Sequence, residues 1–276
     1  MPTWAQPSTQ VNFVASAARR EYRRGVRAMT KRQLLPVLLL ALSCAPPPTS
    51  EAQLPAASSR DVWLLIIHGS GDGPGRWATG MAEALRPRFA EPDRLEVLAY
   101  DWHDAAVDKL SAAVNGRREG RAIAEVIASR GLSHVHVIAH SAGAHVAHGL
   151  ELAWSEQPAP RPTLHLTLLD PFLGEGLDFE WGRTRFGTKA DFTEGLLNRG
   201  DGVPGTEVAV QAAHTFDVTG SKPSGAAWAG KEGHWWPTSA YAELDPAFFD
   251  ASLEASGQFD AEALRARWPA GQTEVR

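Results

Sequence analysis

The chain of 276 residues contains one cysteine, Cys44, so no disulfide bond can form within it. A domain without disulfides has to rely on its hydrophobic core, and 43% hydrophobic residues over this length can build one large core. Long apolar stretches are also scarce. The run from Leu34 to Leu42 is too short to span a bilayer comfortably.

Basic residues are scarce beyond Cys44. The full chain has a formal net charge of −5, and removing residues 1–44 takes away seven basic residues and one acidic residue, which leaves −11. Such a negative charge argues against nucleic acid as a partner and against binding to anionic lipids by electrostatic attraction alone.

The segment before Cys44 has the order of an export signal. Residues 29–32 are basic at two positions, residues 34–42 are apolar, and Cys44 stands where a bacterial lipoprotein carries its lipidated cysteine. We therefore expect an exported protein that is anchored to the membrane of a bacterial cell envelope through Cys44. A plain secretory signal cut near Ala52, giving a periplasmic or secreted protein, is the alternative.

Composition divides the chain into four segments. We interpret residues 1–28 as an over-extended start or a leader, 29–44 as the signal peptide, and 45–60 as a low-complexity linker. Residues 61–276 form the folded domain.

Strand and helix patterns alternate within that domain. The alternation predicts an α/β fold with a mostly parallel central sheet and helices on both faces. Residues 172–204 have weak periodicity, and we expect a surface excursion or a lid there. Strands are expected at 62–67, 95–100, 135–139, 164–169 and 207–213, and helices at 75–85, 104–129, 142–154, 246–254 and 260–267.

The stretch from His134 to His145 is the most specific motif of the chain. An apolar run ends in Ala-His-Ser-Ala-Gly, and a helical pattern of small residues follows. This is the form of a nucleophile elbow, Gly-x-Ser-x-Gly, with Ala139 in place of the first glycine. The motif indicates Ser141 as a nucleophile and the amide of Ala142 as a donor to an oxyanion.

A second motif lies upstream, where an apolar strand ends in His68-Gly69-Ser70. Acyl transfer needs another N–H donor for the oxyanion, and a glycine-rich loop after a strand can supply it. We expect the amide of Ser70 to be this donor.

With these motifs the chain resembles the pancreatic lipase and phospholipase A1 group of α/β-hydrolases, over about residues 62–240. The family's disulfide cysteines, long lid and C-terminal lipid-binding domain have no counterpart here, and no calcium-ligand pattern is evident. The matching segments are His68-Gly69 with Asp72, Gly73 and Trp77; Tyr100-Asp101-Trp102; 115–128; 135–145; Leu169-Asp170-Pro171; 210–215; and Gly233-His234 with Pro237.

A serine nucleophile needs a histidine base and an acid that orients the histidine. His234 is the best base because it follows the last recognisable strand, with His214 as the alternative. For the acid, Asp170 directly follows an apolar strand and matches the family's triad acid, and Asp217 is the alternative.

The resemblance implies a serine hydrolase that cleaves carboxylic esters, in the manner of a lipase or esterase, through an acyl-enzyme. We expect an ester or lipid substrate and no cofactor. We also expect no metal, because the crowd of histidines around the elbow lacks a carboxylate to complete a ligand set. A catalytically inactive α/β-hydrolase that serves as a binding protein of the cell envelope, and an acyltransferase, are the alternatives.

Overall fold

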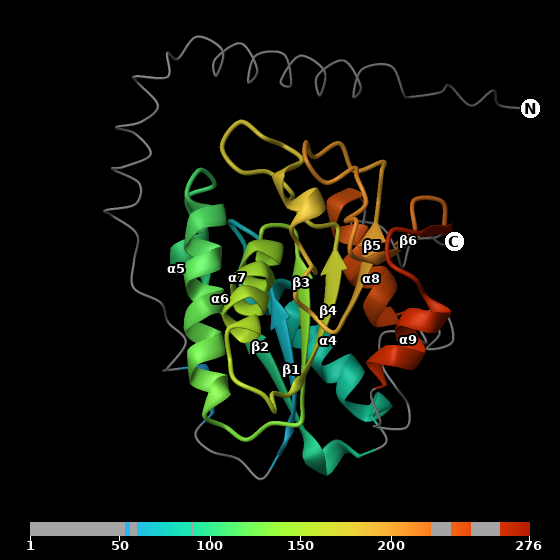
Figure 1. Ribbon diagram of the computed structural model, residues 1–276. Coiled ribbons are helices and arrows are strands. Elements are labelled where there is room, and N and C mark those ends of the chain that lie inside the picture. Colours follow the sequence, from blue (N-terminus) through green and yellow to red (C-terminus); the bar gives the residue numbers. More distant parts are fainter. Residues whose placement is uncertain (1–52, 56–59, 90, 222–232, 244–259) are drawn as a thin grey trace, which may run out of the picture. The chain divides into compact units, whose positions relative to one another are not determined.

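Seven parallel strands form the central sheet of an α/β fold (Figure 1). The computed structural model describes residues 53–55, 60–89, 91–221, 233–243 and 260–276. The expectations about the leader, the signal peptide, Cys44 and the helix at 246–254 lie outside the described residues, as does most of the linker.

The predicted parallel sheet with helices on both faces is confirmed. The strand order is β2-β1-β3-β4-β5-β6-β7, and every neighbouring pair is parallel. The strands are β1 Val62–Ile67, β2 Leu95–Tyr100, β3 His134–His140, β4 Thr163–Leu169, β5 Phe192–Leu197, β6 His214–Asp217 and β7 Thr273–Val275.

Two expectations about the strands were wrong. The strand expected at 207–213 is irregular backbone, and the sheet resumes only at β6. Residues 172–204 are not merely an excursion or a lid, since they contain β5, which is buried throughout. Glu194 and Gly195 interrupt the apolar pattern of β5 and conceal it in the sequence. The strand β7 was not predicted.

The helices largely follow the predicted pattern. The helix expected at 104–129 is divided, because Asp108 accepts hydrogen bonds from the Leu110 amide and the Ser111 hydroxyl and forms a turn between two helices. The helices are α4 Ala78–Leu85, α5 His103–Ala106, α6 Ala112–Ala128, α7 Gly143–Ser155, α8 Trp236–Glu243 and α9 Ala261–Arg267. No helix within the described ranges is long and apolar enough to cross a membrane.

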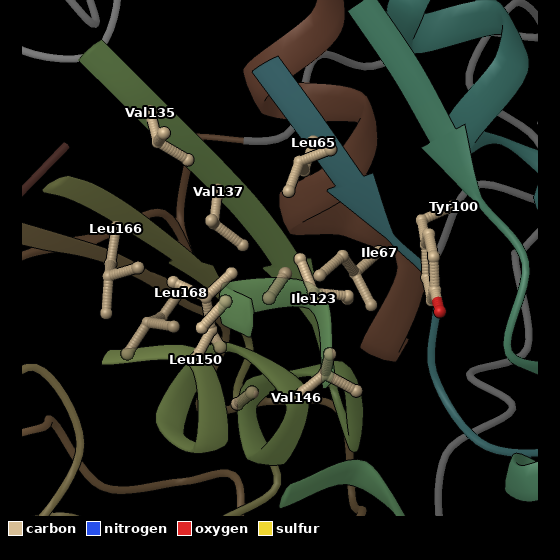
Figure 2. Close-up of a cluster of buried hydrophobic side chains, with 14 of the residues drawn as sticks. Leu65, Ile67, Tyr100, Ile123, Val135, Val137, Val146, Leu150, Leu166 and Leu168 are labelled. Atoms are coloured by element: carbon tan, nitrogen blue, oxygen red, sulfur yellow. The ribbon is translucent and has the colours of Figure 1, made fainter. Parts of the chain in front are cut away.

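The hydrophobic core lies on both faces of the sheet. Alternate residues of the strands point to opposite faces, so each strand contributes to two clusters. One cluster joins the sheet to α6 and α7, as Figure 2 shows for Val137 and Leu168 of the strands and Ile123 and Leu150 of the helices. The other cluster joins the opposite face to α4, α8 and α9.

Glycines allow α6 and α7 to pack closely. A Cβ atom added at Gly149 would lie 2.6 Å from Cα of Arg117, and one added at Gly120 would lie 2.6 Å from the backbone nitrogen of Leu150. No side chain fits at these two positions, so the helix that follows the elbow is held directly against its neighbour.

The carboxyl ends of β1, β3 and β4 meet at one edge of the sheet. The register pairs Ile67 with Ala139 and His140 with Leu169. His68, Ser141 and Asp170 each follow directly after one of these strands, at the edge where ligands bind in open parallel sheets.

Candidate active site

Ser141 forms the turn between β3 and α7 in a strained conformation. Its φ is 54°, in the left-handed region that few residues other than glycine adopt. Such strain costs on the order of 1–3 kcal/mol and persists only where surrounding contacts impose it. The serine is partly exposed, whereas the six residues of β3 before it are buried.

Two glycines make room for this turn. A Cβ atom at Gly143 would lie 2.8 Å from the carbonyl oxygens of both Ile67 and His68, so the start of α7 lies against the end of β1. A Cβ atom at Gly69 would lie 2.9 Å from Cβ of Ser141 and 3.4 Å from its Oγ. The loop after β1 therefore passes directly beside the serine.

Asp170 follows β4 and also has a positive φ, 46°. Main-chain hydrogen bonds join its turn to that of Ser141: the Ser141 amide donates to the Leu169 carbonyl at 3.1 Å, and the Phe172 amide donates to the Ser141 carbonyl at 3.0 Å. The Asp170 side chain is fully buried, and its Oδ1 accepts the Asn198 amide at 2.9 Å. Both strained turns are thus parts of one hydrogen-bonded edge.

His234 is held by two carboxylates. Its Nδ1 donates to Oδ2 of Asp170 at 2.9 Å and to Oδ2 of Asp201 at 2.8 Å. The imidazole is 14% exposed, and its Nε2 is buried without a hydrogen-bond partner among the described residues. The two acids fix the tautomer and leave Nε2 as the nitrogen that can exchange a proton.

Asp201 was missed at the level of the sequence. It lies in Gly200-Asp201-Gly202, which has the composition of an ordinary turn. Recognition of β5 was the signal that could have identified it, because a polar residue soon after a parallel strand lies at the same edge as Asp170. The Asp201 side chain is buried, and it also accepts the Val203 amide and the Thr206 hydroxyl, each at 2.9 Å.

The proximity of three ionisable groups changes their pKa values. Burial raises the pKa of the Asp170 carboxyl to about 7, and the nearby charge of Asp201 acts in the same direction. Burial would also raise the pKa of Asp201, but the hydrogen bond from His234 and other donors outweigh it and lower that pKa. Burial would lower the pKa of His234, but its bonds to the two acids raise it to about 9. At neutral pH the imidazole is therefore mostly protonated.

Neighbouring side chains fix the backbone around His234. The side-chain nitrogen Nδ2 of Asn198 donates to the Gly233 carbonyl at 2.6 Å, and Nε2 of His140 donates to the His234 carbonyl at 2.9 Å. The rings of His140 and His234 lie 4.6 Å apart. His140 also lies beside the serine, since its Nδ1 is 3.4 Å from the position of a Cβ atom on Gly69. The ring of His140 thus borders both Ser141 and His234.

The alternative acid and base lie elsewhere. The Asp217 carboxylate accepts hydrogen bonds from Nε of Arg199 and from the Thr219 hydroxyl, each at 2.6 Å. His214 is buried at the start of β6, and its Nδ1 bonds the Pro269 carbonyl at 3.1 Å. The structure therefore brings Asp170 to His234, and it leaves Asp217 and His214 in local contacts of their own.

The loop that carries Ser70 is shaped by His68. The buried ring donates from Nδ1 to the Gly69 carbonyl at 2.9 Å, and its Nε2 accepts the Trp102 amide at 3.3 Å. The Trp102 indole in turn donates to the His68 carbonyl at 2.7 Å. Ser70 and Ala142, the expected oxyanion donors, belong to segments that lie against each other beside Ser141.

Trp235 is partly buried and lies beside this site. Its ring lies 4.7 Å from that of His140, and the guanidinium of Arg76 lies 3.9 Å above it. Trp236, in contrast, is buried, and its indole donates to the Val218 carbonyl at 2.8 Å. Of the tryptophan pair, only Trp235 borders the site.

Two sets of side chains within the described residues could hold a metal ion. One is Asp170, Asp201 and His234, whose mutual hydrogen bonds are given above. The other is His136, His165 and Glu194, on three neighbouring strands. The sequence had indicated that no carboxylate completes a ligand set among the histidines, and this was wrong because Glu194 lies on the unrecognised strand β5.

No protein-family model matches this sequence, and a search of curated proteins gave no match.

Proposed function

We propose that the chain is a serine hydrolase with an α/β-hydrolase fold, which cleaves carboxylic esters through an acyl-enzyme at Ser141. The conformation of Ser141 is the main support. A residue that follows a buried parallel strand, has a φ of 54° and begins a helix against two glycines presents its hydroxyl at the carboxyl edge of the sheet. A buried structural serine has no need of this strain.

In the proposed reaction, Nε2 of His234 accepts the proton of the Ser141 hydroxyl as Oγ attacks the ester carbonyl carbon. The negative charge that develops on the carbonyl oxygen is stabilised by the amides of Ser70 and Ala142, each donor being worth about 3–4 kcal/mol in a studied case. The ester C–O bond then breaks, and His234 returns the proton to the leaving alkoxide. Water repeats the sequence on the acyl-enzyme and releases the carboxylic acid.

Asp170 and Asp201 position His234 in this scheme. Each accepts from Nδ1, which keeps Nε2 free for the proton and stabilises the imidazolium that forms. Contacts between base and nucleophile are often long without substrate and tighten when it binds, so the unpartnered Nε2 is compatible with the role of a base.

A fluorophosphonate probe tests the proposal directly, because it phosphonylates only an activated serine. We expect the purified full-length chain to be labelled and peptide mass spectrometry to place the label on Ser141. The Ser141→Ala variant is the control and should not react. A folded protein that is not labelled would contradict the proposal and favour the inactive binding protein. Labelling together with preferential acyl transfer to an added alcohol would favour the acyltransferase.

A further inference from the structure

Arg76 places a positive charge beside the candidate active site. It ends the short 3-10 helix Pro74–Arg76, in the loop that continues from Ser70. The residue is exposed, and its guanidinium makes no hydrogen bond or ion pair with any other residue that the structure describes. The proposed reaction makes no use of this charge, so its N–H groups are available to a ligand.

Two tryptophans hold Arg76 in place. The guanidinium carbon lies 3.9 Å from the centroid of the Trp235 ring, which itself lies 4.7 Å from the ring of His140. The next residue, Trp77, meets the same His140 ring edge-on, with centroids 5.7 Å apart and an angle of 78° between the planes. A guanidinium stacked on an aromatic ring keeps the N–H groups of its edge free for another partner. The charge is therefore fixed in position before any ligand binds.

This stack lies next to the proposed base. The rings of His234 and Trp235 lie 6.3 Å apart, and those of His140 and His234 lie 4.6 Å apart. In the proposed reaction His234 protonates the leaving alkoxide, so the alcohol portion of the ester has to lie against Nε2 of this histidine. Side chains that border His234 therefore face the alcohol portion of the substrate.

We propose that the protein prefers esters whose alcohol portion carries an anionic group, a carboxylate or a phosphate, and that Arg76 binds this group. The inference rests on the proposed function. The planar guanidinium matches two oxygens of either anion, and such charge-assisted hydrogen bonds are among the strong ones. Because Trp235 already holds the side chain, little conformational freedom is lost when the anion binds. Arg76 would determine specificity and take no part in breaking the ester bond.

The test compares acetate esters that differ in the charge of the alcohol portion. The anionic substrates are the acetyl esters of 4-hydroxybenzoate and 4-hydroxyphenyl phosphate, and the neutral reference is the acetyl ester of 4-hydroxybenzamide. Each kcat/KM of the full-length chain is divided by the rate of spontaneous hydrolysis, which corrects for the reactivity of the leaving group. We expect a preference of about 10-fold for at least one anionic ester at low salt. High salt should reduce it, because an exposed charge is screened.

Substitutions of Arg76 show whether this residue causes the preference. Arg76→Gln should lower the ratio of kcat/KM for anionic and neutral esters about 10-fold. Arg76→Lys keeps the charge without the planar fork and should lower the ratio by a smaller factor; it also serves if Arg76→Gln does not fold. Arg86→Gln is the matched control, because it removes the same charge from an exposed residue at the far end of α4 and should leave the ratio unchanged. A role confined to packing on Trp235 would change the turnover of all esters alike.

A wild type that hydrolyses the neutral ester without preferring either anionic one would overturn this inference and leave the proposed function standing. The same preference in Arg76→Gln would also overturn it, because another group then binds the anion. So would a preference for an anion in the acyl portion only, measured with mono-4-nitrophenyl succinate against 4-nitrophenyl butyrate. No turnover of any of these esters would contradict the proposed function itself, and this inference with it. The larger of the two preferences distinguishes a carboxylate from a phosphate as the bound group.

Discussion

Asp170 and Asp201 share one hydrogen-bond donor, Nδ1 of His234, at 2.9 and 2.8 Å. The two acids come from turns that follow neighbouring strands, β4 and β5, and both side chains are buried. Burial raises the pKa of Asp170 to about 7, and the charge of the neighbouring Asp201 acts in the same direction, whereas hydrogen bonds from His234 and other donors lower the pKa of Asp201. In the proposed reaction, each acid can hold the histidine in its working tautomer.

We therefore expect the acids to substitute partly for each other. Asp170→Asn and Asp201→Asn should each lower kcat by about 10-fold to 100-fold, because one carboxylate remains on Nδ1. The double variant should lose about 10⁴-fold, the loss known for a triad that lacks its only acid. The measurement is kcat for a p-nitrophenyl ester across the double-mutant cycle.

Asp217→Asn is the control for this cycle. Asp217 bonds Arg199 and Thr219 and makes no contact with His234, so kcat should stay near that of the wild type. If Asp170→Asn alone removed the full 10⁴ and Asp201→Asn changed nothing, Asp201 would have no part in orienting the base. A large loss in Asp217→Asn would transfer the acid's role to that residue.

The raised pKa of His234 predicts an alkaline rate profile. A general base acts only when neutral, so with a pKa of about 9 the value of kcat/KM should rise from pH 7, reach half its maximum near pH 9 and level off about one pH unit above that. Asp201→Asn removes one of the two bonds that raise this pKa, and the midpoint should move toward neutral pH.

The profile is measured from pH 6 to 10.5 with spontaneous hydrolysis subtracted. An independent reading is the NMR titration of the His234 ring in Ser141→Ala. A midpoint near 6.5 by both methods, unchanged in Asp201→Asn, would show that the two carboxylates do not raise the pKa of the histidine.

Substitutions at Ser141 separate strain from function. Ser141→Ala should lower kcat by a factor on the order of 10⁶, as loss of a serine nucleophile does elsewhere, with little change in stability. Ser141→Gly should be equally inactive but more stable by about 1 kcal/mol, because glycine adopts a φ of 54° without strain. Ester turnover and thermal unfolding measure the two effects. Appreciable turnover in both variants would exclude Ser141 as the nucleophile.

The sequence predicts those parts of the fold whose local pattern matches their environment. The bounds of β1 and β2 were predicted correctly and those of β3 and β4 nearly so, since these strands are apolar runs. The glycines in the turns after β1 and β3 indicate that these two turns lie close to each other. Ser141, Asp170 and His234 could be selected because each lies in or beside such a motif.

The parts that could not be predicted depend on tertiary contacts. β5 carries a buried Glu194, whose carboxylate accepts a hydrogen bond from Thr167 on the neighbouring strand and lies 3.4 Å from Nε2 of His165. Without β5, Asp201 reads as a residue of an exposed turn, although it is buried against His234. The segment 207–213 is the reverse case, since its sequence resembles a strand but its backbone is irregular. Val210 of this segment is nevertheless buried in the hydrophobic core.

The contact between α6 and α7 gives a last prediction, which concerns stability alone. In a helix, Gly→Ala normally stabilises by about 0.5–1 kcal/mol. At Gly149 the new methyl group would overlap the backbone of Arg117, and backbone cannot move aside as a flexible side chain does. Gly149→Ala should therefore destabilise the fold by about 1–3 kcal/mol, the usual effect of overpacking. Gly80→Ala, in the exposed part of α4 with no atom within 4 Å of the new Cβ, is the matched control and should stabilise it. Chemical denaturation of both variants measures the change in the free energy of unfolding, which should be negative for Gly149→Ala and positive for Gly80→Ala. A stabilising Gly149→Ala would mean that α6 and α7 are further apart than described and that the elbow helix is not held by this contact.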